Sequence, residues 1–400
     1  MRKIALWFAL VLLAFASPAV ARPLTILVSI DGFRADYLDR GVTPVLSGLA
    51  ASGARAAMRP SFPSKTFPNH YTLVTGLRPD HHGIVENNME DPGIPGVTFK
   101  MSNQDAVADR RWWDGGEPIW VSAERAGIRT ATMFWPGSEA PIHGVRPGLW
   151  VHFDPSKTSA QRVDQVLAWL DLPAGERPSL VTLYFDEVDT AGHYFGPESQ
   201  ELNAAAARVD QALGRLTAGL KDRGEAANIV VVADHGMADV SEDRRLVLDD
   251  LLPPGAAPVR ALGQGAFMTL YPGAGHEAEA EAALVGEHPH LTCWKKGHFP
   301  ARFHYGQNSR VAPIFCLPQT GWEIFSRDAK PSTEKGTHGF DPYAPEMAAV
   351  FVASGPAFRP GVRLRTFDNV DVYLLLARLV GVKPQPSDGS LTPLRRSLAH

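Results

Sequence analysis

The sequence predicts an α/β fold: a doubly wound, mostly parallel sheet with helices on both faces. Three observations lead to this prediction. Short, strongly apolar segments alternate along the chain with longer segments of helical periodicity, and glycines follow several of the helical segments. Hydrophobic residues make up 44% of the 400-residue chain, enough for a large buried core, which excludes a disordered or collagen-like protein. Apolar strands that alternate with capped helices are typical of a sheet covered on both faces.

The first residues have the pattern of a secretory signal peptide. The basic residues Arg2 and Lys3 precede an apolar run over 4–16, and Ala19 and Ala21 form a small-x-small cleavage pattern. That run is too short to span a bilayer, and no later segment is apolar for long enough to do so. We therefore expect residues 1–21 to be cleaved and the protein to be exported, to the periplasm or beyond it.

The elements that follow are predicted from periodicity and caps. A strand over 24–30 runs directly into Asp31. Asp31 therefore lies at the carboxyl end of this strand, where ligand-binding sites are usually found in an open α/β sheet. Thr43 and Pro44 then start a helix that Gly53 ends. The other predicted helices cover 117–126, 160–170, 198–223 and 370–380. The other predicted strands cover 130–135, 180–185, 228–233 and 347–353.

Between about 250 and 335 the segments become short and rich in Pro, Gly and His. We expect an irregular insertion at one end of the sheet, inside a single α/β domain over 22–400. The insertion contains Cys293 and Cys316, the two cysteines of the chain. Because an even pair in an oxidising compartment is more often bridged than free, we predict a disulfide between them.

Residues of metal-ligand type follow several predicted strands. They are Asp31, Asp186, Asp189, His193, Asp234, His235 and His338. Each residue alone also fits an ordinary role, such as a helix cap or a hydrogen-bonded structural histidine. Their combination favours a binuclear metal site at one edge of the sheet. Mixed Asp and His donors suit zinc better than calcium, because calcium avoids nitrogen ligands.

A nucleophile is predicted within 62–70, Phe-Pro-Ser-Lys-Thr-Phe-Pro-Asn-His. Two prolines constrain this segment, and residues 69–75 can start a helix, whose N-terminal N–H groups favour an anion nearby. Thr66 is the candidate, since a neighbouring metal ion can stabilise its alkoxide at neutral pH. Without metal ligands elsewhere in the chain, a role as a helix cap would be the better interpretation.

Eight motifs follow one another along the chain. They are Ser-Ile-Asp-Gly-Phe-Arg at 29–34, Lys-Thr-Phe-Pro-Asn-His-Tyr at 65–71, Thr-Gly-Leu-Arg-Pro at 75–79, His-Gly-Ile at 82–84, Phe-Trp-Pro-Gly-Ser at 134–138, Asp-Thr-Ala-Gly-His at 189–193, Asp-His-Gly-Met at 234–237 and His-Gly at 338–339. Together they closely resemble the nucleotide pyrophosphatase/phosphodiesterase family, within the alkaline phosphatase superfamily. The resemblance runs from about 24 to 380 and is strongest to secreted bacterial members that consist of the catalytic domain alone.

The resemblance implies an alkaline-phosphatase-like fold with two zinc ions per chain. The ligands carried over from the motifs are, for one zinc, Asp31, Thr66, Asp234 and His235, and, for the other, Asp189, His193 and His338. Asp186, where the family commonly has Glu, would not bind a metal ion and would have a structural role. Asn87 would hydrogen-bond a phosphoryl oxygen together with the backbone N–H of Thr66.

The resemblance also implies a slot for a nucleobase. Phe67 would form one face, and Phe153 stands where relatives place Tyr, which keeps the stacking and loses a hydroxyl. The stretch from 135 to 153 corresponds to an insertion that closes the pocket of nucleotide-hydrolysing members and that the lysophospholipase D branch lacks. This favours nucleotides over lysolipids.

The implied reaction is hydrolysis of nucleotide phosphodiester and pyrophosphate bonds through a phospho-threonine, for example ATP to AMP and pyrophosphate. A phosphomonoesterase of the same superfamily and a non-catalytic secreted zinc-binding protein are the alternatives. A sulfatase would require a Cys or Ser in a Cys/Ser-x-Pro-x-Arg context, and neither Cys293 nor Cys316 fits it. With 39 Lys and Arg against 43 Asp and Glu, nothing suggests capture of long nucleic acid. A monomer is compatible with this interpretation.

Overall fold

The computed structural model describes residues 23–330 and 332–399. The predicted signal peptide over 1–21 lies outside the described residues and stays a prediction. Among the described residues, no helix is long and apolar enough to cross a membrane.

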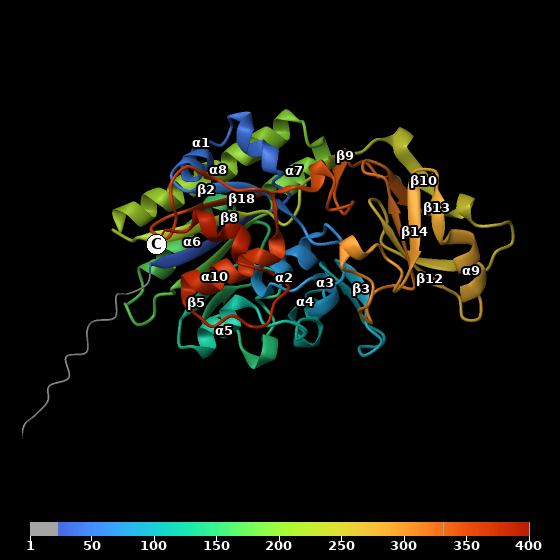
Figure 1. The fold of residues 1–400 in the computed structure, drawn as a ribbon, viewed down its shortest axis with the longest axis horizontal. Helices are drawn as coiled ribbons and strands as arrows, with labels where there is room; N and C mark the ends of the chain where they lie inside the picture. The colour runs from blue at the N-terminus through green and yellow to red at the C-terminus, as the bar shows by residue number, and fades with distance from the viewer. Residues whose placement is uncertain (1–22, 331, 400) are drawn as a thin grey trace, which may run out of the picture.

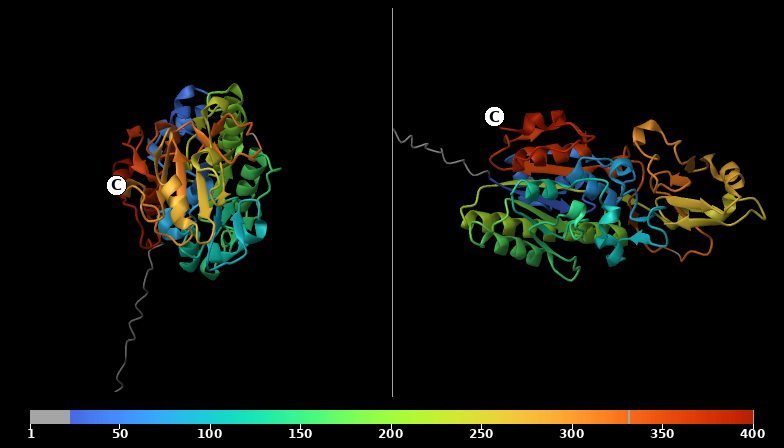
Figure 2. Two further views of the ribbon diagram at one scale, coloured as in Figure 1. Left: turned by 90° about the vertical axis from the view of Figure 1, so that its right-hand side faces the viewer. Right: turned by 90° about the horizontal axis from the view of Figure 1, so that it is seen from below.

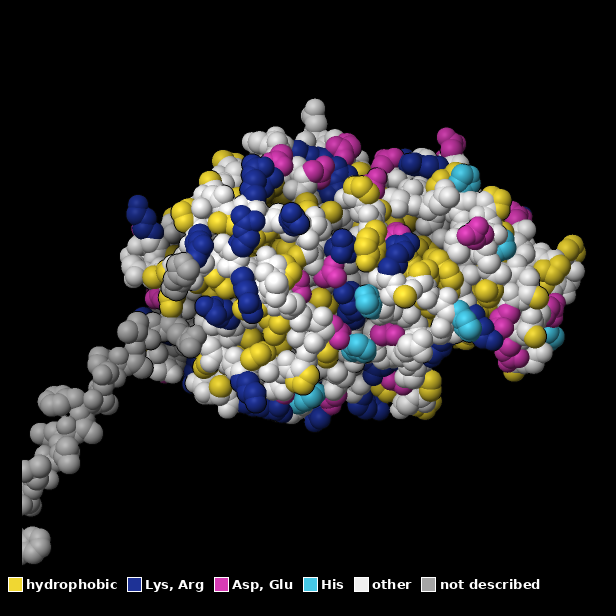
Figure 3. Space-filling model, viewed as in Figure 1, with side chains coloured by type: hydrophobic (Ala, Val, Ile, Leu, Met, Phe, Trp, Pro, Cys, Tyr) yellow, Lys and Arg dark blue, Asp and Glu magenta, His cyan; other side chains and the backbone are white. Residues whose placement is uncertain are grey.

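On the face drawn in Figure 3, basic side chains are interspersed with hydrophobic and acidic ones, and a group of acidic side chains lies at the far end of the insertion.

The central sheet is built around one buried strand, β1 (Leu24–Ile30). It pairs in parallel with β7 (Leu180–Phe185) on one side and with β8 (Ala227–Val232) on the other. Beyond β7, the sheet continues in parallel through β5 (Thr130–Met133) to β6 (Leu149–Val151). β1 and β7 are buried along their whole length, which explains why both read as continuous apolar runs.

On the other side of β8 the sheet becomes antiparallel. β18 (Ala349–Ser354) runs antiparallel to β8 and to β2 (Ala54–Arg59). The short strands β19 (Val362–Arg363) and β20 (Phe367–Asp368) pair in parallel with β2 at this edge. The sheet is therefore mostly parallel, as predicted. β2 was not predicted, because its half-buried residues include two arginines and show no apolar run.

Helices cover both faces of the sheet, as the alternating pattern predicts. One layer contains α1 (Pro44–Ala51), α6 (Ser159–Leu170), α7 (Glu187–Phe195) and α8 (Gln200–Asp222), and the other contains α2 (Thr66–Thr75), α5 (Ile119–Arg125) and α10 (Val372–Val380). In the right-hand view of Figure 2, α10 and the pair of α6 and α8 lie on opposite sides of the sheet. The helices predicted at 44–53, 117–126, 160–170, 198–223 and 370–380 coincide with observed ones to within two residues at each end, whereas the helix predicted from residue 69 starts at Thr66.

The end of α1 differs from the prediction that Gly53 stops this helix. The helix ends at Ala51, and Ser52 is its C-cap. Gly53 is needed for another reason: a Cβ at this position would lie 2.0 Å from the carbonyl oxygen of Ala353 in β18. The glycine therefore permits a close approach of two backbones and does not cap the helix.

Several short elements surround the main sheet. After α2 come α3 (Pro79–His82), the hairpin of β3 (Asn88–Glu90) and β4 (Thr98–Lys100), and α4 (Gln104–Ala108). Two further strand pairs join the main sheet to the insertion: β9 (Ala238–Asp239) with β17 (Gly336–Thr337), and β10 (Arg245–Val247) with β16 (Glu323–Phe325).

The insertion is ordered, and the prediction of irregular structure was wrong in this respect. It forms an antiparallel sheet in the order β11 (Val259–Leu262), β12 (Met268–Pro272), β15 (Ile314–Pro318), β14 (Leu291–Lys295) and β13 (Gly286–His288), with α9 (Glu277–Leu284) packed beside it. Figure 1 shows it in yellow and orange, projecting from one end of the main sheet. Its strands have three to five residues, too few for a clear period-two pattern.

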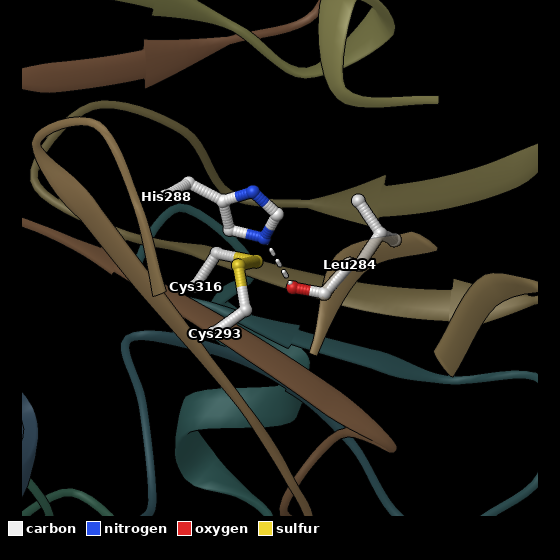
Figure 4. The surroundings of a disulfide bond; sticks show 4 residues. All are labelled: Leu284, His288, Cys293 and Cys316. Atoms are coloured by element: carbon white, nitrogen blue, oxygen red, sulfur yellow. Dashed lines mark hydrogen bonds between the residues drawn. A yellow bond between two sulfur atoms is a disulfide. The ribbon is translucent and has the colours of Figure 1, made fainter. Parts of the chain in front are cut away.

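The disulfide between Cys293 and Cys316 is present, as predicted. The two cysteines face each other across β14 and β15 and are buried in a hydrophobic cluster of the insertion, separate from the main core (Figure 4). The bridge therefore joins two strands of the smaller sheet and does not connect the insertion to the main sheet.

Candidate active site

A first cluster of metal-ligand residues lies where two neighbouring strands of the main sheet end. Asp31 follows β1, and Asp234 and His235 follow β8, its parallel neighbour. The Nε2 atom of His235 lies 2.9 Å from Oδ2 of Asp234 and 3.5 Å from Oδ1 of Asp31. All three side chains are buried. The parallel register thus brings together residues about 200 positions apart in the sequence.

The second cluster combines α7 with the segment that follows β17. Asp189 and His193 lie four residues apart in α7 and therefore on the same face of the helix. Nε2 of His193 is 3.5 Å from Oδ2 of Asp189, and Nε2 of His338 is 3.7 Å from Oδ1 of Asp189. The helix and the late segment thus supply one group of three donors.

The two clusters adjoin each other. The rings of His235 and His338 stack with centroids 3.5 Å apart and planes inclined by 12°. Gly32, next to Asp31, packs against Asp189, because a Cβ on this glycine would lie 3.0 Å from Oδ1 of Asp189. The structure therefore brings the six predicted Asp and His residues together as two adjoining clusters of three.

The donor set fits divalent metal ions. Three buried carboxylate oxygens, Asp31 Oδ1, Asp189 Oδ1 and Asp234 Oδ2, receive no hydrogen bond from the described residues. Burial and the neighbouring carboxylates raise the pKa of Asp31 and Asp234, while burial lowers the pKa of His235. Buried carboxylate oxygens without a hydrogen-bond donor are costly, and a bound metal ion would satisfy them together with the neighbouring imidazoles.

The N-terminus of α2 presents Thr66 to the first cluster. Thr66 is the first residue of the helix, and Lys65 occupies the N-cap position, so Thr66 is not a helix cap. Its Oγ1 lies 3.3 Å from Nε2 of His235. Asn69 fixes the start of the helix, because its Oδ1 accepts the N–H of Ser61 at 2.7 Å and its Nδ2 donates to the carbonyl of Lys65.

Asn87 lies beside the same helix start. Its Oδ1 accepts a hydrogen bond from the N–H of Phe67 at 2.9 Å. The side-chain oxygen is occupied by this bond, so the Nδ2 group is the donor that remains for a ligand. Asn87 and Thr66 line the same cavity.

An aromatic cavity of about 190 Å³ opens next to Thr66. Phe67 and Phe153 line it, as the resemblance implied, together with Phe134 and Tyr184. The rings of Phe134 and Phe153 meet edge to face with centroids 5.3 Å apart. Phe134 has a φ of 62°, a left-handed conformation that is strained for this side chain and is found most often at functional sites.

Tyr184, on strand β7, was missed by the sequence analysis. Its hydroxyl donates a hydrogen bond of 2.6 Å to Oδ2 of Asp31, while its ring lines the aromatic cavity. The side chain thus orients a candidate ligand and forms a wall of the neighbouring cavity. Tyr184 is the last residue but one of the predicted strand over 180–185, and this position near the carboxyl end of a strand could have indicated a role in the site.

Asp186 lies outside both clusters. Its Oδ1 pairs at 2.8 Å with Nη1 of Arg162, whose side chain is 2% exposed. Arg162 also donates to the carbonyl of Tyr184, so the ion pair supports the end of β7.

Two further charged residues adjoin the second cluster. Nζ of Lys65 donates to the carbonyl of His338 at 2.9 Å, so this cation faces the second cluster. Oε2 of Glu334 lies 3.4 Å from Nδ1 of His193. Burial lowers the pKa of His193, but the carboxylates of Asp189 and Glu334 outweigh it and raise this pKa to about 9. A bound metal ion would have to displace a proton from His193, while Nδ1 of this ring hydrogen-bonds the carbonyl oxygen of Gly336 at 3.0 Å, which orients it.

Comparison with known proteins places these features in a family. The model of a family described as type I phosphodiesterase/nucleotide pyrophosphatase matches residues 25–341. An uncharacterised pyrophosphatase/phosphodiesterase of Schizosaccharomyces pombe is 40% identical over 398 residues, which cover 93% of this chain and 80% of that protein. Ectonucleotide pyrophosphatase/phosphodiesterase family member 3 of Rattus norvegicus is 36% identical over 92% of this chain, but the match spans only 43% of that longer protein.

Solved structures agree with these matches. Murine ectonucleotide pyrophosphatase/phosphodiesterase 5 superimposes with a TM-score of 0.88 at 33% identity, over 94% of this chain and all of that chain. The same mouse protein is also known as an inactive threonine-to-alanine variant in complex with AMP, with the same TM-score and coverage. The alkaline-phosphatase-like α/β fold is thereby confirmed.

Proposed function

This chain belongs to the type I phosphodiesterase/nucleotide pyrophosphatase family, and we propose that it hydrolyses phosphodiester and pyrophosphate bonds of nucleotides and releases nucleoside 5'-monophosphates. One observation carries the proposal: the hydroxyl of Thr66 lies between the first metal-ligand cluster and a cavity walled by aromatic side chains. A nucleophile, a metal site and a surface for a base are thus adjacent.

Two zinc ions are proposed for the two clusters. Asp31, Asp234 and His235 with Thr66 would hold one, and Asp189, His193 and His338 the other. Oxygen and imidazole donors in these numbers are typical of zinc sites. When bound, the ions would stabilise an alkoxide and the negative charge that develops on the phosphoryl oxygens.

Thr66 is the proposed nucleophile. As its Oγ1 forms a bond to phosphorus, the bond to the leaving group on the opposite side breaks, and a phospho-threonine results. Water then attacks from the side that the leaving group has vacated, the bond between phosphorus and Oγ1 breaks, and the monophosphate and the Thr66 hydroxyl are released as Oγ1 regains a proton. Nδ2 of Asn87 and the N–H of Thr66, at the positive end of the α2 dipole, would bind a phosphoryl oxygen during both steps.

The aromatic cavity is proposed to bind the base. Phe67 and Phe153 would stack on the base. The stretch from 135 to 153, which is separate from the insertion at 250–335, would close this slot. The AMP complex of the mouse relative, obtained with a threonine-to-alanine variant that is inactive, supports both a nucleotide ligand and an essential threonine. Export through the predicted signal peptide remains part of the proposal.

A diesterase fits the charges near Thr66 better than a phosphomonoesterase. A monoesterase needs cationic groups for the extra phosphate oxygens, whereas Lys65 is engaged with the carbonyl of His338. A non-catalytic zinc protein would have no need of a threonine hydroxyl at the metal cluster.

The test compares two chromogenic substrates with one leaving group. Purified protein is assayed with the p-nitrophenyl ester of thymidine 5'-monophosphate and with p-nitrophenyl phosphate, before chelation, after chelation and after zinc is restored. We expect far higher kcat/KM for the diester, loss on chelation and recovery with zinc. A monoester rate far above the diester rate would make the protein a phosphomonoesterase.

A further inference from the structure

A buried histidine of α2 lies beside the site but belongs to neither cluster of three donors. His70 follows Thr66 by one helical turn, and its side chain is completely buried. It lines neither of the two cavities that Thr66 lines. His70 is therefore placed to act through another residue and not on a substrate directly.

Both ring nitrogens of His70 have hydrogen-bond partners. Nδ1 lies 2.9 Å from the carbonyl oxygen of Thr66, and Nε2 lies 2.8 Å from Oγ of Ser29. Because a carbonyl oxygen can only accept, Nδ1 carries a proton and donates it. Burial lowers the pKa of His70 to about 3, so the ring is neutral and Nε2 accepts from the hydroxyl of Ser29. The ring thus joins Ser29 to Thr66.

Ser29 belongs to the strand that leads to a candidate ligand. It is the last residue but one of β1, and Asp31 directly follows this strand. β1 is buried along its whole length and is paired on both sides, with β7 and with β8. The link through His70 therefore connects the first turn of α2 to the end of the central strand, where the first cluster lies.

Two aromatic side chains fix the orientation of the His70 ring. The rings of Trp135 and Tyr184 meet it edge to face, with centroids 5.1 Å and 5.2 Å away. Nε1 of Trp135 also donates to the carbonyl of His70 at 3.2 Å. Oδ2 of Asp234 lies 3.5 Å from Nδ1 of His70, farther than the carbonyl of Thr66. The packing thus directs Nδ1 to the start of α2.

We propose that His70 is a positioning residue that holds Thr66 in place for in-line attack by joining the start of α2 to Ser29 of β1. This inference rests on the proposed function, because it requires Thr66 to be the nucleophile. The attacking oxygen must approach phosphorus opposite the leaving group, and a displacement of about 1 Å can lower a rate about a hundredfold. Loss of the link should therefore affect the attack more than the binding of substrate.

The test removes the link from its two ends. Ser29→Ala leaves the ring in place and should lower kcat for the p-nitrophenyl ester of thymidine 5'-monophosphate by roughly three- to tenfold, with KM within about twofold of the wild type. His70→Asn keeps an amide that can reach the carbonyl of Thr66 but has no counterpart of Nε2, so kcat should fall at least as far. The double variant should lose no more than His70→Asn alone, because both changes remove the same hydrogen bond.

His82→Asn is the matched control. His82 is also a completely buried histidine beside α2, but its Nε2 contacts Oγ1 of Thr72 at 3.0 Å and the carbonyl of Pro68 at 3.2 Å. This variant should lower the free energy of unfolding and leave the kcat of the folded enzyme unchanged. Urea denaturation gives the folded fraction of each variant, so that kcat is compared per folded molecule.

Two further measurements locate the effect of Ser29→Ala. Methyl p-nitrophenyl phosphate lacks a base, so an equal loss on this substrate excludes an effect through the walls of the aromatic cavity. Elemental analysis should find the wild-type zinc content. A zinc loss that matches the lost activity would place the effect on Asp234 and overturn the inference. An unchanged kcat, a loss confined to KM, additive losses in the double variant or an equal loss in His82→Asn would also overturn it.

The Thr66→Ala background separates this inference from the proposed function. Adding Ser29→Ala to Thr66→Ala should not lower the residual rate further, because the link acts through the hydroxyl that is already missing. A further loss of the same size as in the wild type would contradict positioning of Thr66. Failure of the proposed function gives a different result: Thr66→Ala alone would then keep nearly the wild-type rate, or the wild type would hydrolyse neither diester.

Discussion

Oγ1 of Thr66, at the start of α2, lies 3.3 Å from Nε2 of His235, at the end of β8. The two residues are 169 positions apart in the chain. Because His235 belongs to the cluster with Asp31 and Asp234, the threonine hydroxyl faces the candidate metal site and does not cap its own helix.

Thr66→Ala should lower kcat by roughly three orders of magnitude or more, because the variant lacks the hydroxyl that faces the first cluster. The fold and at least part of the zinc should remain, since Asp31, Asp234 and His235 are unchanged. Thr66→Ser should retain some activity, because it keeps a hydroxyl at the metal site. Steady-state kinetics and elemental analysis measure both; an alanine variant near the wild-type rate would identify water as the nucleophile.

The configuration at phosphorus should be retained over the whole reaction. Each in-line attack inverts it, and a phospho-threonine requires two attacks. A substrate made chiral at the α-phosphorus with sulfur and oxygen isotopes reports the outcome without any mutation. Small alcohols should also compete with water and yield nucleotide esters. Net inversion would leave Thr66 as a ligand only.

Asp189→Asn should lower the zinc content and activity, whereas Asp186→Asn should leave the zinc content unchanged. Asp189 has a buried carboxylate oxygen without a hydrogen bond, while Asp186 pairs with Arg162. Asp186→Asn keeps an acceptor for Arg162 and loses only charge, so the free energy of unfolding should fall by about 1 kcal/mol. Elemental analysis and urea denaturation of both variants decide this; equal zinc loss in the two would contradict the assignment.

Phe153→Ala should raise KM for nucleotide substrates by roughly tenfold, because stacking on a base contributes about 1–3 kcal/mol. Methyl p-nitrophenyl phosphate, which lacks a base, is the control and should be hydrolysed at nearly the wild-type rate. Phe153→Tyr, which introduces the residue common in the family, should keep the low KM. Similar losses on both substrates in the alanine variant would indicate a structural role for Phe153.

Replacing Cys293 and Cys316 by alanine should lower the free energy of unfolding of the insertion by about 2–4 kcal/mol. The bridge lies between β14 and β15, within the cluster of the smaller sheet, so the catalytic groups of the main sheet should remain in place. Chemical denaturation measures the first effect and kcat the second. Complete loss of activity at full folding would mean that the insertion positions the catalytic groups.

Much of the main sheet could be predicted from local sequence, because β1 and β7 are buried on both faces and each reads as one apolar run. The helix ends could be predicted to within about two residues, because they have recognisable caps, such as the capping box of Thr158 and Gln161 on α6. The insertion could not, because its strands have only three to five residues, and its central strand β15 pairs with β12 and β14, which precede it by more than 15 residues.

By itself, the sequence determined which residues are candidate ligands, since Asp31, Asp234 and His235 follow predicted strands whose direction follows from the alternating fold. Only the tertiary structure decided which of these groups lack partners, that Tyr184 holds Asp31, and that His70 joins Ser29 to the carbonyl of Thr66. The physical reason is that the position after a strand is set by chain order, whereas a contact between distant segments depends on how whole layers pack.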